Sequence, residues 1–116
     1  VCPTLILDPP AEAKIWEEEV FGPAMAIVPF TSRDEAIDLV QGLPGEPLHL
    51  YVFTPSHAVF HEYTHQCTAS GAFQNDVMIQ GASHYLPFGG IGTSGHGNYY
   101  GKYSFLTFTH AYPVGY

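Results

Sequence analysis

Three short apolar runs, separated by helix-forming segments, constrain the fold of this chain more than any other feature. The runs occupy residues 25–30 and 48–53, and a third begins at residues 72–73. An unbroken apolar run of this length is typical of a strand buried on both faces, as in a parallel sheet. The alternation of strand and helix predicts right-handed parallel crossovers. We therefore expect an α/β fold with a mostly parallel sheet and crossover helices in a three-layer-like arrangement.

The segments between the apolar runs have clear helix boundaries. Ser32 can cap a helix while Glu35, three residues later, reaches back, and Gly42 then ends it. Pro55-Ser56 opens a second helix that Gly71 closes. Before these, residues 5–7 are expected to form a strand, and the acidic segment 11–19 a short helix or helical turn.

Charge and length exclude several classes of function. The 116 residues suffice for one domain, and the formal charge of −8 disfavours binding to nucleic acid or an anionic membrane. No apolar run reaches the roughly 18 residues that span a bilayer. Cys2 and Cys67 do not form a disulfide framework, so we expect a reducing, cytoplasmic location.

One motif resembles a zinc site. His61-Glu62-Tyr63-Thr64-His65 matches H-E-x-x-H, and His57 extends the same helix face by one turn. Val59, Phe60, Tyr63 and Cys67 lie on the opposite, apolar face, which must meet the sheet. The histidines are therefore expected to point to solvent, and no native metal site is expected. The pattern leaves open whether the three histidines bind a metal ion.

The segment from residue 76 to residue 101 is rich in Gly, Ser, His and Tyr and is predicted to be a loop at the carboxyl ends of the strands. Its glycine-rich part, residues 89–95, contains no lysine and does not directly follow a strand-like run. We expect a structural turn that needs positive φ and close backbone approach, rather than a phosphate-binding loop.

Several motifs together closely resemble the aldehyde dehydrogenase superfamily. They are E-E-V-F-G-P at residues 18–23, S-R-D-E-A-I at 32–37, L-Y-V-F at 50–53, P-F-G-G-I-G-T-S-G at 87–95, and G-K-Y-S-F with F-T-H at 101–110. The closing run is most similar to the class-3-like branch. The resemblance covers essentially all 116 residues, as one domain, and implies the C-terminal part of a truncated catalytic domain. It includes no dinucleotide-binding domain.

The resemblance also implies site residues. Glu19 resembles the glutamate that binds the nicotinamide ribose, and Phe21 the aromatic residue beside the nicotinamide, both as vestiges of an ancestral site. The stretch from Val77 to Leu86 matches the wall of the aldehyde tunnel. The implied substrate-pocket residues are Asn75, Met78, Ile79, Gln80 and Phe88. The chain departs from the class-3-like pattern at Tyr99-Tyr100, at Ala111-Tyr112 and at Gln74.

Aldehyde oxidation needs a thiolate, a base and a bound nicotinamide. Cys2 precedes Glu19 too closely to match the nucleophile of the family, and Cys67 lies on an apolar helix face. No cofactor is expected, and NAD(P) would bind only if another chain completed the site. The chain alone is therefore not expected to oxidise aldehydes.

Two hypotheses follow. In the first, a free-standing protein catalyses non-redox acid–base chemistry (isomerisation, cyclisation or dehydration) on a small carbonyl compound, with catalytic candidates His84, Asp76, Tyr85 and His96. In the second, the chain is a non-catalytic fragment or partner subunit of an NAD(P)-dependent aldehyde dehydrogenase. Either form needs its sheet edge covered, by self-association into a homo-oligomer or by a partner chain.

Overall fold

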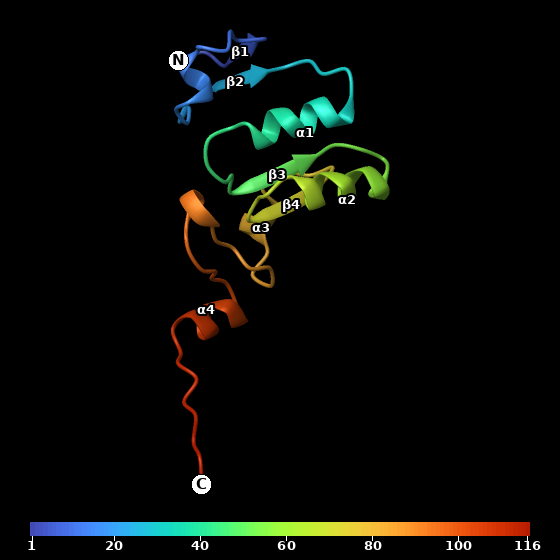
Figure 1. The fold of residues 1–116 in the computed structure, drawn as a ribbon. Coiled ribbons are helices and arrows are strands. Elements are labelled where there is room, and N and C mark those ends of the chain that lie inside the picture. Colours follow the sequence, from blue (N-terminus) through green and yellow to red (C-terminus); the bar gives the residue numbers. More distant parts are fainter. The chain divides into compact units, whose positions relative to one another are not determined.

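The computed structural model describes residues 1–116 and divides into two compact units, Val1–Pro44 and Gly45–Tyr116 (Figure 1). Each unit contains one two-stranded parallel sheet, β1–β2 in the first and β3–β4 in the second. The predicted α/β class, with parallel strands and connecting helices, is confirmed. The two units are described separately below.

The first unit begins with β1 (Thr4–Leu7), which pairs in parallel with β2 (Ala24–Ile27) so that Thr4 lies opposite Ala24 and Leu7 opposite Ile27. Between the strands the chain forms only one 3-10 turn, η1 (Lys14–Trp16). Of the two forms expected for residues 11–19, a short helix or a helical turn, the structure has the turn, which does not extend into a longer helix. No side chain caps its start, and the acidic residues 17–19 would stand at the helix C-terminus, where the helix dipole disfavours negative charge.

Helix α1 (Arg33–Gln41) follows, and its start was predicted correctly. The Ser32 hydroxyl accepts the backbone N–H of Glu35 at 3.2 Å. The Glu35 carboxylate in turn accepts the Thr31 hydroxyl and the Thr31 N–H, each at 2.7 Å. These two hydrogen bonds, that of the hydroxyl first, lower the pKa of Glu35. Ala36 and Ile37 are the buried apolar residues of this helix.

The second unit contains a complete parallel crossover. Strand β3 (His49–Val52) leads through α2 (His57–Gln66) to β4 (Gly71–Gln74), with His49 opposite Gly71 and Val52 opposite Gln74. Ser56 caps α2 by accepting the Val59 N–H. The helix ends at Gln66, not at Gly71 as predicted. Gly71 belongs to the strand, where a Cβ would lie 2.8 Å from the His49 ring.

The segment predicted to be a loop contains two short helical elements, α3 (Ile79–Ala82) and η2 (Gly92–Ser94). An isolated antiparallel bridge joins Phe88 to Tyr99 and closes the glycine-rich turn between them. Helix α4 (Lys102–Thr107) follows, and residues 108–116 contain no helix or strand. Because β4 ends just before residue 75, this whole segment begins at the carboxyl edge of the β3–β4 sheet.

Candidate functional site

Asn75 ties the carboxyl ends of β3 and β4 together. Its side-chain carbonyl accepts the Thr54 N–H at 2.7 Å, and its amide NH₂ donates to the Thr54 carbonyl at 2.8 Å. The residue has a left-handed backbone with φ 58°, a conformation that asparagine tolerates better than most residues. Asn75 was predicted to line the substrate pocket, and the structure places its amide on the backbone of Thr54, just beyond the end of β3.

The next residues form an apolar, solvent-facing turn. The Asp76 carboxylate accepts the Val77 N–H at 2.7 Å, and Met78 takes a left-handed backbone with φ 61° before α3 begins. Met78 is 69% exposed, and Val77 and Ile79 are also exposed. Two residues of the predicted pocket, Met78 and Ile79, therefore present apolar side chains to solvent.

Gln80, by contrast, is buried, with only 3% of its surface exposed. Its NH₂ group donates to the Tyr51 hydroxyl at 2.7 Å and lies 3.2 Å from Nδ1 of His49. Its carbonyl oxygen Oε1 is buried without a hydrogen-bond partner. Gln80 therefore anchors α3 to strand β3 through two side chains on the same face of that strand.

His49 joins two of the predicted pocket residues, although sequence reasoning did not select it. Its ring lies 5.7 Å from the Phe88 ring and 5.7 Å from the Phe73 ring, while Nδ1 faces Gln80. Burial lowers the pKa of His49, which favours the neutral imidazole. One feature of the sequence indicates His49, namely a histidine within an apolar run that is predicted to be a buried strand. A polar side chain in such a strand needs a buried hydrogen-bond partner.

The four predicted acid–base residues, Asp76, His84, Tyr85 and His96, are all exposed. The His84 ring meets the Tyr100 ring edge to face at 5.5 Å, whereas Tyr85 is 91% exposed. None of the four lines the cleft of the first unit that is described below. Exposure leaves each group in the high dielectric of water. The pKa of a catalytic acid or base is usually adjusted by burial or by nearby charged groups instead.

The predicted cofactor-contacting residues lie in the first unit, between η1 and β2. Glu19 is exposed and Phe21 is 91% exposed. The preceding acid, Glu18, forms an exposed ion pair with Lys14 at 3.9 Å. Both predicted residues are thus accessible to a molecule that approaches from outside the first unit.

The glycine-rich turn has the structural role that its sequence predicted. Gly92 and Gly95 have positive φ, and a Cβ on Gly89 or Gly90 would overlap backbone atoms of residues 94–98. The turn is held by Glu46, whose carboxylate accepts the N–H and hydroxyl of Thr93, each at 3.0 Å. Thr93 in return accepts the Glu46 N–H at 2.9 Å.

The histidine face of α2 is also as predicted. His57, His61 and His65 are exposed, while Cys67 is buried and Val59, Phe60 and Tyr63 are half-buried. No group of three or more His, Cys, Asp and Glu side chains is placed to hold a metal ion. Cys2 and Cys67 are both free thiols.

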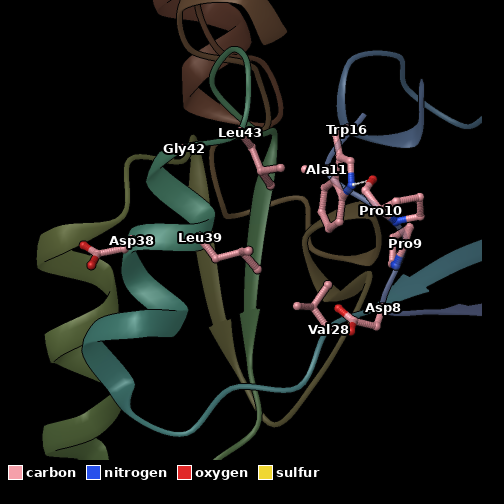
Figure 2. Close-up of a pocket in the computed structure, with 10 residues that line it drawn as sticks. All are labelled: Asp8, Pro9, Pro10, Ala11, Trp16, Val28, Asp38, Leu39, Gly42 and Leu43. Carbon is pink, nitrogen blue, oxygen red and sulfur yellow. Dashed lines mark hydrogen bonds between the residues drawn. The ribbon is translucent and has the colours of Figure 1, made fainter. Parts of the chain in front are cut away.

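A cleft that the sequence did not indicate lies in the first unit, with a volume of about 560 Å³. Figure 2 shows Leu39 of α1 and Leu43 just after this helix on one side and Trp16 and Val28 on the other, while Asp38 points away from them. The indole N–H of Trp16 donates to the Pro10 carbonyl at 2.9 Å, which holds this wall in place. None of the predicted site residues lines this cleft.

No helix of this chain has the length and apolar character needed to cross a bilayer.

Comparison with known proteins gives one consistent result. The sequence pattern of the aldehyde dehydrogenase family matches residues 1–114. Aldehyde dehydrogenase family 3 member A2 of Macaca fascicularis is 39% identical over 113 residues, which is 97% of this chain and 23% of that protein. Family 3 member H1 of Arabidopsis thaliana is 38% identical over 116 residues, which is all of this chain and 24% of that protein.

Solved structures agree. A substrate-bound AldH from Staphylococcus aureus is 39% identical and superposes with a TM-score of 0.85 over 95% of this chain and 24% of that one. An NAD⁺ complex of aldehyde dehydrogenase from Bacillus cereus is 29% identical, with a TM-score of 0.83 over 95% of this chain and 22% of that one. The chain spans about a quarter of the length of these relatives.

Proposed function

This chain belongs to the aldehyde dehydrogenase family, and from that premise we propose that it supplies one wall of an NAD(P)-dependent aldehyde-oxidising site. The nucleophilic thiolate, the base and the dinucleotide-binding domain would come from other segments, joined to this chain or separate. The observation that carries the proposal is the 91% exposure of Phe21 in an intact E-E-V-F-G-P segment. An aromatic ring so exposed is available to pack against a flat, apolar part of a ligand.

Glu19 and Phe21 would have different tasks at the cofactor. The Glu19 carboxylate can accept hydrogen bonds from ribose hydroxyls, and the Phe21 ring can exclude water beside the nicotinamide. NAD(P), when bound, accepts the hydride that leaves the aldehyde carbon. The exposed carboxylate and ring fit such a ligand in kind, since one offers acceptors and the other an apolar face.

The substrate side of the proposal rests on the turn before α3. Val77, Met78 and Ile79 are exposed apolar side chains, held by the Asp76 hydrogen bond on one side and by buried Gln80 on the other. Such a surface favours an aldehyde with an apolar chain over a charged or sugar-like one. Cys67 does not compete for the nucleophile's role, because it is buried and burial raises the pKa of its thiol.

The sheet of the first unit supports a role within a larger body. Leu5 and Leu7 on β1 and Met25 on β2 are 67%, 72% and 57% exposed. Their register places Leu5 directly opposite Met25, so the exposed residues form a continuous apolar face. A face of this kind is normally covered by another element or chain. A second copy, as in a homo-oligomer, or the rest of a dehydrogenase would meet this need, and the two free thiols support a reducing, cytoplasmic setting.

A chimaera tests the proposal directly. The equivalent quarter of the Staphylococcus aureus AldH is replaced by this chain, and NAD(P)H formation with an apolar aldehyde is followed. We expect activity in the chimaera and none in this chain alone. Glu19→Gln should reduce the activity through a higher KM for the cofactor, whereas the neighbouring Glu17→Gln should not. A folded chimaera that binds NAD⁺ but oxidises no aldehyde would contradict the proposal.

A second candidate is non-redox acid–base chemistry on a small carbonyl compound. The observation that favours it is the exposed His84 imidazole, oriented by its edge-to-face contact with Tyr100. Turnover by the isolated chain that is lost in His84→Ala and kept in His96→Ala would support this function. Equal turnover in both variants would remove His84 from the mechanism. The first proposal ranks higher because the four acid–base candidates are all exposed to solvent.

A further inference from the structure

Two histidines on α2 stand one helical turn apart and face solvent together. The ring centroids of His61 and His65 are 6.4 Å apart, and the ring planes differ by 36°. Both side chains are exposed, so rotation about their side-chain bonds is not restricted by packing on that face. The Phe60 ring lies 5.8 Å from the His61 ring, on the half-buried side of the helix. The helix thus presents two imidazoles at the i, i+4 spacing of a bidentate ligand.

A pair of imidazole groups binds late first-row transition-metal ions in preference to other divalent cations. Neutral imidazole nitrogen is a good ligand for Zn²⁺, Cu²⁺ and Ni²⁺, whereas Mg²⁺ and Ca²⁺ prefer oxygen. In such a complex each nitrogen lies about 2.0–2.1 Å from the metal. The two rings must therefore approach each other from their present separation, which exposed side chains can do by a change of rotamer.

Two long-range electrostatic effects favour the binding of a cation at His61 and His65. The chain carries a formal charge of −8, which attracts cations to its surface. His65 lies in the last turn of α2, where the partial negative charge of the helix C-terminus stabilises positive charge. Neither electrostatic effect depends on whether the chain takes part in aldehyde oxidation.

We propose that His61 and His65 form a surface chelate for a late first-row divalent cation, with water in the remaining coordination positions. His57 is not assigned to this pair, because the hydrogen bond between its Nδ1 and the Gln74 side-chain carbonyl at 2.7 Å holds its ring toward β4, whereas the ring contact on this face joins His61 to His65. The site differs from an H-E-x-x-H protease centre, which needs a further protein ligand and a cleft. Because the chelate bridges one turn of α2, the metal stabilises this helix when it binds.

Nickel ions alone are a suitable probe, measured by calorimetric titration of the 116-residue chain at neutral pH. We expect one site that is weakened about tenfold or more by His61→Ala and by His65→Ala. His57→Ala is the matched control, since it removes an exposed histidine from the same helix, and it should bind nickel as wild type does. Acidification should release the metal, because protonated imidazole cannot coordinate.

The double variant His61→Ala/His65→Ala reports nickel binding by all other groups, including Cys2 and the loop histidines. Wild-type binding no stronger than that of the double variant would overturn the proposal. A loss in His57→Ala as large as in the other two single variants would also overturn the two-histidine assignment. Copper(II) electron paramagnetic resonance provides a second measurement, with hyperfine coupling from two imidazole nitrogens expected in the wild type. Far-UV circular dichroism verifies that each variant keeps α2.

Discussion

The side-chain amide of Asn75 forms a two-point hydrogen bond with the backbone of Thr54, 21 residues earlier in the chain. Asn75 directly follows β4 and Thr54 lies two residues after the end of β3, so this contact joins the two chain segments beyond the last residues of the ladder. The segment that carries the predicted substrate pocket begins at the next residue. The Asn75 amide therefore fixes the point from which that segment starts.

Asn75→Ala should lower the free energy of unfolding by ~1–3 kcal/mol, because it removes two hydrogen bonds and leaves a left-handed alanine. Asn75→Gly loses the same hydrogen bonds but accepts the left-handed backbone, and it should be less destabilising than Asn75→Ala. Urea unfolding followed by circular dichroism measures both. If the two variants were as stable as wild type, the amide contact would have no structural role.

Glu46 should make the stability of the chain depend on acid pH. Hydrogen bonds from the Thr93 N–H, and then from its hydroxyl, lower the pKa of the Glu46 carboxyl. The unfolded chain therefore takes up the proton at higher pH than the folded chain does. The resulting stabilisation is complete above the unfolded pKa and is lost as pH falls through the folded pKa.

Glu46→Gln should therefore be less stable than wild type at neutral pH, and the difference should shrink as the pH is lowered. Glu17→Gln, on an exposed acid of the first unit, is the control and should show no such convergence. Urea midpoints measured from neutral to acid pH give both curves. Parallel curves for Glu46→Gln and wild type would show that the Thr93 contacts do not hold the carboxylate.

Gln80 should tolerate an apolar residue of similar length better than a small one. Gln80→Ala leaves a cavity beside Tyr51 and His49 and should cost ~2–4 kcal/mol. Gln80→Met keeps most of the volume and removes the unpartnered Oε1, so it should cost clearly less. Thermal unfolding compares the two, and a methionine variant less stable than the alanine variant would contradict this account.

The glycine-rich turn should accept side chains only where backbone approach allows them. A Cβ on Gly90 would overlap the Ser94 carbonyl, so Gly90→Ala should destabilise by ~2 kcal/mol or more. A Cβ on Gly81 in α3 would have no heavy atom within 4 Å. Gly81→Ala should therefore be neutral or stabilising by up to ~1 kcal/mol. Urea unfolding of the two alanine variants separates these outcomes, and equal stability would disprove the steric argument.

The two thiols should differ in reactivity. Cys2 is exposed, whereas Cys67 is 5% exposed and burial raises the pKa of its thiol. Reaction with a colorimetric disulfide reagent should therefore proceed in a fast and a slow phase of equal amplitude. Cys2→Ser should remove only the fast phase, and denaturant should abolish the difference. A fast phase that persists in Cys2→Ser would show that Cys67 is accessible.

Local signals predicted the elements well. Ser32 and Ser56 start their helices where the sequence indicates, because an N-cap depends on residues only three positions away. The histidine face of α2 and the close approach at Gly89 and Gly90 also follow from short-range geometry. In the segment 11–19, helix-forming residues without a side-chain cap form a single helical turn, which is one of the two forms expected there.

The site was less predictable because its contacts join residues far apart in sequence. Gln80 meets Tyr51 and His49 across 29 and 31 positions, and no spacing rule connects them. Residue type alone selected His84, Tyr85 and His96, yet type does not determine burial, and all three are exposed. The family motifs identified the stretch that follows β4, whereas only the structure showed that Gln80 within it is buried and that its neighbours are not.

The apolar face of β1 and β2 has a consequence for how the protein behaves at high concentration. The exposed side chains of Leu5, Leu7 and Met25 favour hydrophobic association between copies of the chain. The net charge of −8 opposes this association, because like-charged molecules repel each other. Because that repulsion is screened within about 10 Å at 0.1 M salt, dilute buffer preserves the dispersed chain and added salt promotes its clustering. We therefore expect the solubility of this protein to fall as the ionic strength rises.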